Sequence, residues 1–410
     1  MTAVTQLPGV VVTEHEFDVP LDHARPEGER IDVFAREVAD PDGRDRPFLV
    51  FLQGGPGHEA PRPTRHPSSP GWLDRALAEF RVLLLDQRGT GRSTPVDVPP
   101  GTPAEQAEYL AHFRADSIVA DAEWIRRELG VDRWSVLGQS FGGFCVATYL
   151  SRAPEGLREA FFTGGVPPVG TPVDEIYAAT YGRMLERNAR YYDRYPADRD
   201  KVRALAKLLA EDDVRLPSGD RLTFRRFRQA GNALGMSDGA EKLHYLLELP
   251  PTSRAFRHDA EQVMPFARNP IYAVIHEACY ADGGATRWSA ERVRPAAFDD
   301  DVTLLTGEHV FPWMFEDFGE LAPLREAADL LAEREWPRLY DADRLRANEV
   351  PAAAAIYYDD PYVESRFSME TVALTRGLRP WLTNEYDHNA LRADGARVLD
   401  RLIDLARGSA

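Results

Sequence analysis

Short apolar runs alternate with amphipathic stretches over the first 165 residues of the chain. Residues 47–52 and 81–86 are dominated by apolar side chains, which predicts strands buried on both faces, and the pattern of residues 72–80 between them predicts a helix. The alternation continues with a helix over about 115–129, a strand at 134–137, a helix over about 141–153 and a strand at 159–163. This order predicts right-handed crossovers and an α/β fold with a doubly wound, mostly parallel sheet.

The pattern changes near residue 170, where long, charged, amphipathic helices replace the buried strands. The strand pattern returns at 350–358, and a last helix over about 394–406 ends the sequence. We therefore predict one α/β core that is interrupted by a mostly helical cap. The core comprises residues 1–169 and residues 346–410, which supply its last strand and helix, and the cap comprises residues 170–345. Two tandem domains are the alternative, but the final strand and helix would then have no sheet to join.

Composition and charge narrow the possible partners. The chain has 410 residues, 43% of them hydrophobic and 28% charged, as in ordinary globular proteins. Its net charge of −17 argues against binding to nucleic acid or to an anionic membrane, because both would repel it. No stretch approaches the roughly 20 apolar residues that span a bilayer, and no secretory signal is visible, so we expect a cytoplasmic protein.

The two cysteines, Cys145 and Cys279, are too few for a disulfide framework or a thiolate metal site. We expect neither a metal nor a cofactor, and nothing in the sequence indicates an oligomeric state.

A small-residue pattern, Gly138-Gln-Ser140-Phe-Gly142, lies between a predicted strand and a predicted helix. The nucleophile elbow of α/β-hydrolases needs this context, because the strained turn holds the serine hydroxyl above the sheet and tolerates no bulk two residues to either side. Ser140 is therefore the predicted nucleophile. The alternative is an ordinary turn in which the serine only caps the helix.

A glycine-rich loop at residues 53–57, Gln-Gly-Gly-Pro-Gly, follows the first predicted strand. Glycines allow backbone N–H groups to approach a substrate carbonyl closely, so we predict an oxyanion hole made by the amides of Gly55 and Phe141. The alternative is a plain connecting loop. At the end of the second predicted strand, Asp86 and Arg88 are predicted to form an ion pair that fixes the nearby loops.

Three motifs together resemble the prolyl aminopeptidase (proline iminopeptidase) family of α/β-hydrolases: residues 53–57, residues 86–93 (Asp-Gln-Arg-Gly-Thr-Gly-Arg-Ser) and residues 138–143. The likeness continues through residues 163–168, 272–277 and 307–315, so it covers most of the chain and fits the longer subgroup of the family. One departure is Gln53, where many members have histidine. The resemblance implies an α/β-hydrolase fold and a serine exopeptidase that needs no cofactor.

The chain order of this fold, nucleophile, acid and then histidine, completes a catalytic triad. His388 lies in a polar loop just before the last predicted helix, where the fold carries its base. The acid should follow the returning strand, and the resemblance favours Asp360 over the alternative Asp359. Asp387 is disfavoured because it adjoins the histidine in sequence.

The resemblance also implies a pocket for the substrate. A protonated α-amine needs buried carboxylates, and the family's acidic cap residues match Glu277 and Glu308. Tyr280, Phe311 and Trp313 are candidates for an apolar wall around a pyrrolidine ring, with Phe141 as a further one.

Three functions remain open at this point. The first is an exopeptidase that releases an N-terminal residue, preferentially proline, from a short peptide with a free N-terminus. The second is an esterase or amidase with small non-peptide substrates, which would not need paired carboxylates. The third is a catalytically silent fold that serves as a binding module, which the presence of Ser140, Asp360 and His388 argues against.

Overall fold

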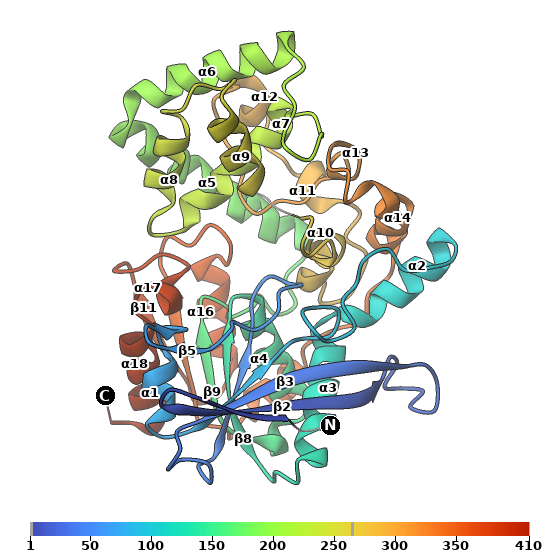
Figure 1. The fold of residues 1–410 in the computed structure, drawn as a ribbon, viewed down its shortest axis with the longest axis vertical. Helices are drawn as coiled ribbons and strands as arrows, with labels where there is room; N and C mark the ends of the chain where they lie inside the picture. The colour runs from blue at the N-terminus through green and yellow to red at the C-terminus, as the bar shows by residue number, and fades with distance from the viewer. Residues whose placement is uncertain (1–2, 264–265, 410) are drawn as a thin grey trace.

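Nine strands form one sheet in the computed structural model of the chain, which describes residues 3–263 and 266–409 (Figure 1). In spatial order the strands are β1 (Ala3–Leu7), β2 (Val10–Pro20), β3 (Arg30–Ala39), β7 (Arg81–Leu85), β4 (Phe48–Leu52), β8 (Trp134–Gln139), β9 (Leu157–Thr163), β10 (Ala352–Tyr357) and β11 (Leu378–Thr383). The strands from β7 to β11 pair in parallel, and β1, β2 and β3 add antiparallel strands at one edge. The predicted doubly wound, mostly parallel sheet is thereby confirmed.

The strands predicted from apolar runs are the buried central ones. β4 and β10 are buried along their whole length because helices cover both faces of the sheet. The strands missing from the prediction lie toward the edges. β11 alternates little and is mostly exposed, with Pro380 in its middle, which is tolerated in an edge strand.

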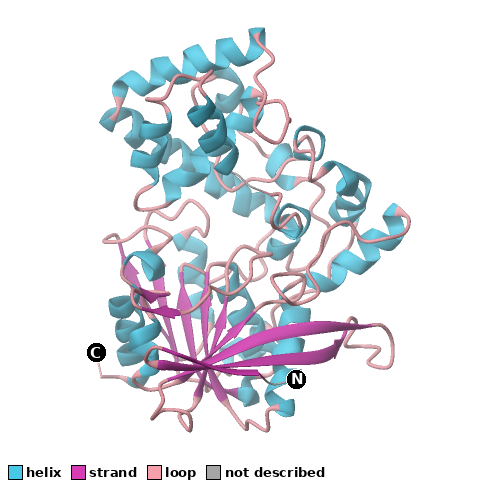
Figure 2. Cartoon of the chain, in the orientation of Figure 1, coloured by secondary structure: helices cyan, strands magenta, loops and turns pink. Residues whose placement is uncertain are grey.

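Helices cover the sheet on both faces, as Figure 2 shows. α1 (Leu73–Leu77) and α18 (Gly395–Arg407) pack on one face, where Trp72 lies 4.8 Å from the ring of Phe51. The other face is covered by α3 (Ala115–Glu128), α4 (Phe141–Arg152) and α16 (Ser365–Leu374). The sequence prediction included α1, α3, α4 and α18 but not α16.

The helices between β9 and β10 form a second layer above the sheet (Figure 1). We call residues 173–346 the helical segment. Its α-helices are α5 (Val173–Arg194), α6 (Pro196–Glu211), α7 (Phe224–Phe227), α8 (Gly239–Leu246), α9 (Arg254–Gln262), α10 (Ile271–Ile275), α11 (Ser289–Arg292), α12 (Ala297–Asp300), α13 (Met314–Asp317), α14 (Arg325–Glu333) and α15 (Ala342–Arg346). The division into core and cap at residues 170 and 345 stays a prediction.

The remaining elements are short. They are β5 (Thr64–Arg65), β6 (Ser68–Ser69), α2 (Pro103–Leu110) and α17 (Ala390–Ala393), with the 3-10 helices η1 (Ala111–Phe113), η2 (Pro154–Gly156), η3 (Arg228–Gly235), η4 (Glu277–Tyr280) and η5 (Ala322–Leu324). Within residues 3–263 and 266–409, no helix combines the length and the apolar character needed to cross a membrane.

Candidate active site

Ser140 stands in a sharp turn between β8 and α4. Its backbone has φ 55° and ψ −125°, a combination that non-glycine residues rarely adopt. The turn requires glycine at positions 138 and 142, because a Cβ atom at either position would collide with the backbone. A Cβ on Gly142 would lie 1.9 Å from the carbonyl oxygen of Leu52, and one on Gly138 would lie 2.3 Å from the carbonyl oxygen of Gly142. The Ser140 side chain makes no capping hydrogen bond to α4, so the alternative of a simple helix cap is wrong.

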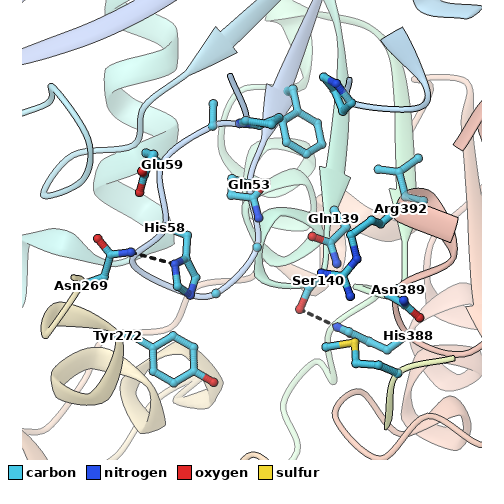
Figure 3. Close-up of a pocket in the computed structure, with 18 of the residues that line it drawn as sticks. Gln53, His58, Glu59, Gln139, Ser140, Asn269, Tyr272, His388, Asn389 and Arg392 are labelled. Carbon is cyan, nitrogen blue, oxygen red and sulfur yellow. Dashed lines mark hydrogen bonds between the residues drawn. The ribbon is translucent and has the colours of Figure 1, made fainter. Parts of the chain in front are cut away.

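The Ser140 hydroxyl instead faces His388. Ser140 Oγ lies 2.9 Å from His388 Nε2, and His388 Nδ1 lies 2.6 Å from Asp360 Oδ2 (Figure 3 shows the first of these contacts). The three side chains are buried, at 8%, 3% and 1% exposure respectively. The structure therefore brings together the nucleophile, base and acid that the sequence analysis names.

The loop after β10 turns its two aspartates in different directions. Asp360 Oδ1 accepts hydrogen bonds from the backbone N–H groups of Tyr362, at 2.8 Å, and Val363, at 3.1 Å. Asp359 turns outward to Arg190, with an N–O distance of 2.7 Å. Only Asp360 contacts the histidine.

One arginine of α5 ties this loop to the loop that carries the histidine. The Arg187 guanidinium donates to the carbonyl of Asp359 at 2.8 Å and to the carboxylate of Asp387 at 2.6 Å. Asp359 and Asp387 directly precede Asp360 and His388 in the chain. The helical segment is thus anchored to both loops at positions adjacent to the triad.

The charge around His388 changes its basicity. Burial lowers the pKa of an imidazole, but the carboxylates of Asp360 and Glu308 outweigh burial and hold the pKa of His388 above its ordinary value. The raised pKa strengthens the imidazole as an acceptor for the Ser140 proton.

The Ser140 hydroxyl opens into a cavity of about 900 Å³ between the sheet and the helical segment. Glu308 lies in the wall of this cavity, where its carboxylate accepts a hydrogen bond from the Tyr272 hydroxyl at 2.5 Å and lies 3.6 Å from His276 Nε2. Burial would raise the pKa of Glu308, but His276 and Tyr272 together hold the pKa below its ordinary value. The wall of the cavity thus carries a partly buried carboxylate, at 15% side-chain exposure, whose charged form is stabilised.

The other predicted pocket residues lie elsewhere. Glu277 is buried behind the cavity, where its carboxylate accepts the backbone N–H of Ala290 at 2.8 Å at the start of α11. Tyr280 is also buried away from the cavity, and its hydroxyl donates to the carbonyl of Tyr362 at 3.1 Å. Phe311 and Trp313 line a separate pocket of about 200 Å³. Of the six candidates for substrate binding, only Glu308 lines the cavity that holds Ser140, because the ring of Phe141 is buried and does not line it.

The glycine-rich loop lies directly against the nucleophile. Gly55 lines the cavity, and a Cβ on Gly54 would come within 2.8 Å of the Ser140 Cβ. Phe141 is the first residue of α4, so its backbone N–H faces out of the helix end, while its ring is buried. Phe141 thus directly follows Ser140, and Gly55 lies in the wall of the same cavity, while the oxyanion hole itself stays a prediction.

The predicted ion pair between Asp86 and Arg88 does not form. Arg88 instead binds the carboxylate of Asp121 on α3, at 2.7 and 2.5 Å, and both side chains are buried. Asp86 accepts the backbone N–H groups of Ala60, at 3.2 Å, and Arg92, at 3.1 Å. Each charge still fixes loops next to the site, Asp86 through Arg92 within the same loop and through Ala60, and Arg88 through Asp121, 33 residues away.

Several cavity residues were not named by the sequence analysis. His58, Phe266 and Tyr272 line the wall with Glu308, and ring centroids 5.5 Å apart for His58 and Tyr272 and 5.9 Å apart for Phe266 and Tyr272 show that the rings pack together. Arg392 lines the cavity near His388. Tyr272 lies in one of the motifs that carry the family resemblance, whereas Phe266 and Arg392 have no local signal.

In the described part of the chain, no cluster of three or more histidine, cysteine, aspartate or glutamate side chains is arranged to hold a metal ion.

Comparisons with known proteins agree with this geometry. A model of the α/β-hydrolase fold family matches residues 47–340. A proline iminopeptidase of Aeromonas sobria is 49% identical, and the alignment covers 98% of each chain. A proline iminopeptidase of Aspergillus aculeatus is 33% identical over 96% of this chain and 93% of its own. The chain belongs to the proline iminopeptidase family of α/β-hydrolases.

Proposed function

We propose that the protein is a cofactor-free serine exopeptidase that releases an N-terminal residue, preferentially proline, from short peptides. One observation carries this function: the hydroxyl of Ser140, hydrogen-bonded to His388, shares a cavity with the partly buried carboxylate of Glu308. A nucleophile for acyl transfer thus lies near a counter-charge for a protonated amine.

The triad supplies the chemistry. His388 takes the proton of Ser140 as its oxygen attacks the scissile carbonyl, and Asp360 stabilises the imidazolium that forms. The amides of Gly55 and Phe141 donate to the developing oxyanion. His388 then protonates the departing amine, and an attacking water, deprotonated by His388, hydrolyses the acyl-enzyme.

The wall beside Glu308 selects the residue that is released. The Glu308 carboxylate binds the protonated N-terminal amine, and the rings of His58, Phe266 and Tyr272 pack against an apolar side chain such as the pyrrolidine of proline. An esterase for neutral substrates would gain nothing from a partly buried carboxylate, which costs free energy to desolvate.

A cytoplasmic location is part of this proposal. Cys145 and Cys279 are both free and buried, and reducing compartments keep such thiols unpaired.

Turnover of matched chromogenic substrates tests the function. We expect prolyl p-nitroanilide to be cleaved faster than alanyl p-nitroanilide, and N-acetylprolyl p-nitroanilide to be cleaved at least about tenfold more slowly, because it lacks the charge that Glu308 binds. Equal rates for free and acetylated substrates would contradict the proposal.

The role of Ser140 is tested separately. Ser140→Ala should abolish turnover and labelling by a fluorophosphonate probe without changing the melting temperature appreciably. Ser151→Ala is a matched control, because Ser151 is also a buried serine of α4 but lies outside the cavity. Residual turnover in Ser140→Ala at the level of the control would refute the mechanism.

A further inference from the structure

The cavity around Ser140 carries charges of opposite sign on its two sides. In Figure 3, Tyr272, which binds Glu308, and His58 lie on one side of Ser140, and Arg392 and Asn389 lie on the other. The cationic side has no role in binding an N-terminal amine. It is the more unusual because the whole chain has a net charge of −17.

Arg392 differs from the other two arginines that line the cavity. Arg62 lies 3.5 Å from the carboxylate of Asp86, and Arg268 forms an ion pair with Glu59. Within the described residues, the Arg392 guanidinium has neither an ion pair nor a side-chain hydrogen bond. Its positive charge acts on the site, because it opposes the rise in the pKa of His388.

The backbone that carries Arg392 is held in place. The Arg392 N–H donates to the carbonyl of Asn389 at 2.8 Å, and the Asn389 side chain accepts the N–H of Ser237 at 2.9 Å. The His388 N–H donates to the carbonyl of Gly235 at 3.2 Å. Arg392 is thus attached to the same fixed stretch of chain as the catalytic base, and its exposed, unpaired side chain lies at the rim of the cavity.

A short peptide with free ends has the complementary charges. Its amine is positive, its C-terminal carboxylate is negative, and the first peptide bond lies between them. We propose that Arg392 binds the C-terminal carboxylate of the substrate, so that the protein selects dipeptides and tripeptides over longer or C-terminally blocked peptides. This inference rests on the proposed function.

Two physical properties support this pairing. A guanidinium can bind a carboxylate through two parallel hydrogen bonds, and it is less strongly hydrated than an ammonium group. Each added residue extends a peptide by up to about 3.3–3.6 Å, so the carboxylate of a longer peptide, with its amine at Glu308, lies beyond the reach of the Arg392 side chain.

The test compares acids with amides. The value of kcat/KM is measured for Pro-Gly and Pro-Gly-NH₂, for Pro-Gly-Gly and its amide, and for prolyl p-nitroanilide, which has no carboxylate. For each protein, kcat/KM for the free acid is divided by kcat/KM for the amide. The intrinsic difference between the two leaving groups is the same in the wild-type protein and in a variant, so it cancels when their ratios are compared. All rates are taken at a pH above the acidic limb of the profile, because removing Arg392 also alters the pKa of His388.

We expect Arg392→Gln to lower the acid-to-amide ratio about fivefold to tenfold, which is the size of a partly exposed charge-assisted contact, and to change prolyl p-nitroanilide turnover less than twofold. Arg392→Lys should lower the acid-to-amide ratio less than Arg392→Gln does, because lysine keeps the positive charge. Arg397→Gln is the matched control, because Arg397 is an exposed arginine of α18 that pairs with Glu385 outside the cavity.

Two outcomes would overturn the inference while leaving the proposed function intact. In the first, Arg392→Gln leaves the acid-to-amide ratio of kcat/KM unchanged. In the second, that ratio falls in Arg62→Gln but not in Arg392→Gln. Both would occur with normal cleavage of prolyl p-nitroanilide. If the wild-type protein cleaved no prolyl substrate, the proposed function would fail, and this inference would fail with it.

Discussion

Replacing Asp360 with asparagine removes the charge of the catalytic acid and keeps its shape. In the native site one carboxylate oxygen accepts from two backbone N–H groups, at 2.8 and 3.1 Å, and the other accepts from His388 Nδ1 at 2.6 Å. An asparagine has a single acceptor oxygen. The two backbone donors attract that oxygen, so the amide NH₂ group turns toward the histidine.

That arrangement selects the wrong tautomer of His388. With an NH₂ donor opposite, Nδ1 becomes the acceptor and the proton moves to Nε2, the atom that lies 2.9 Å from Ser140 Oγ and must take the serine proton. The imidazolium of the transition state also loses its buried counter-charge. The equivalent change in Ser-His-Asp enzymes reduces kcat by about 10⁴-fold, or about 5.4 kcal/mol at 1.36 kcal/mol per tenfold, and we expect a loss of this order.

The assay is kcat/KM on prolyl p-nitroanilide, with circular dichroism and thermal melting to check folding. Asp359→Asn is the control, because the Asp359 side chain is 23% exposed and that of its partner, Arg190, is 54% exposed. Such an ion pair contributes about 1 kcal/mol or less to the free energy of unfolding. We therefore expect a folded variant whose kcat/KM is within about fivefold of the wild-type value. If Asp359→Asn reduced turnover more than Asp360→Asn in folded protein, the assignment of the acid would be wrong.

Three further changes test the electrostatics and the packing. Because a raised pKa keeps His388 protonated to higher pH, and the Glu308 charge contributes to that rise, Glu308→Gln should move the acidic limb of kcat/KM for an uncharged ester to lower pH; a shift to higher pH would contradict this sign. Arg88→Met leaves the buried Asp121 carboxylate with His23, 2.8 Å away, as its remaining side-chain partner, and should lower the unfolding free energy in urea by about 3 kcal/mol, the lower end of the range for a broken buried pair; an unchanged midpoint would argue against the pair. Gly142→Ala places a Cβ 1.9 Å from a strand carbonyl and should cost about 3 kcal/mol or more, whereas Gly182→Ala on α5 meets nothing within 4 Å and should be neutral or stabilising by thermal melting.

The nucleophile could be predicted from the sequence because its requirements are local. An apolar strand, two glycines at fixed offsets and a following helix lie within the 19 residues from Trp134 to Arg152. β11 could not be predicted in the same way. It is an exposed edge strand, so neither burial nor alternation marks its residues.

Side-chain direction accounts for most of what the sequence did not predict at the site. Glu277 and Glu308 were both predicted from the family resemblance, but Glu277 turns to the backbone of α11 and Glu308 turns into the cavity. The partner of Arg88 shows the same limit: Asp121 is 33 residues away on α3, and nothing near Arg88 in the chain indicates it. Such pairings follow from how the elements pack, which residue types alone do not encode.

The double anchorage of Arg187 bears on how this protein fails when it is damaged. The Arg187 guanidinium binds the residues that precede Asp360 and His388 in the chain. If these hydrogen bonds broke, the loops that carry the acid and the base would both become more mobile. If the helical segment moved away from the sheet, the cavity around Ser140 would become more open to solvent. Ser140 would then have no aligned histidine to accept its proton. We therefore expect such a molecule to be inactive toward peptides rather than less selective among them.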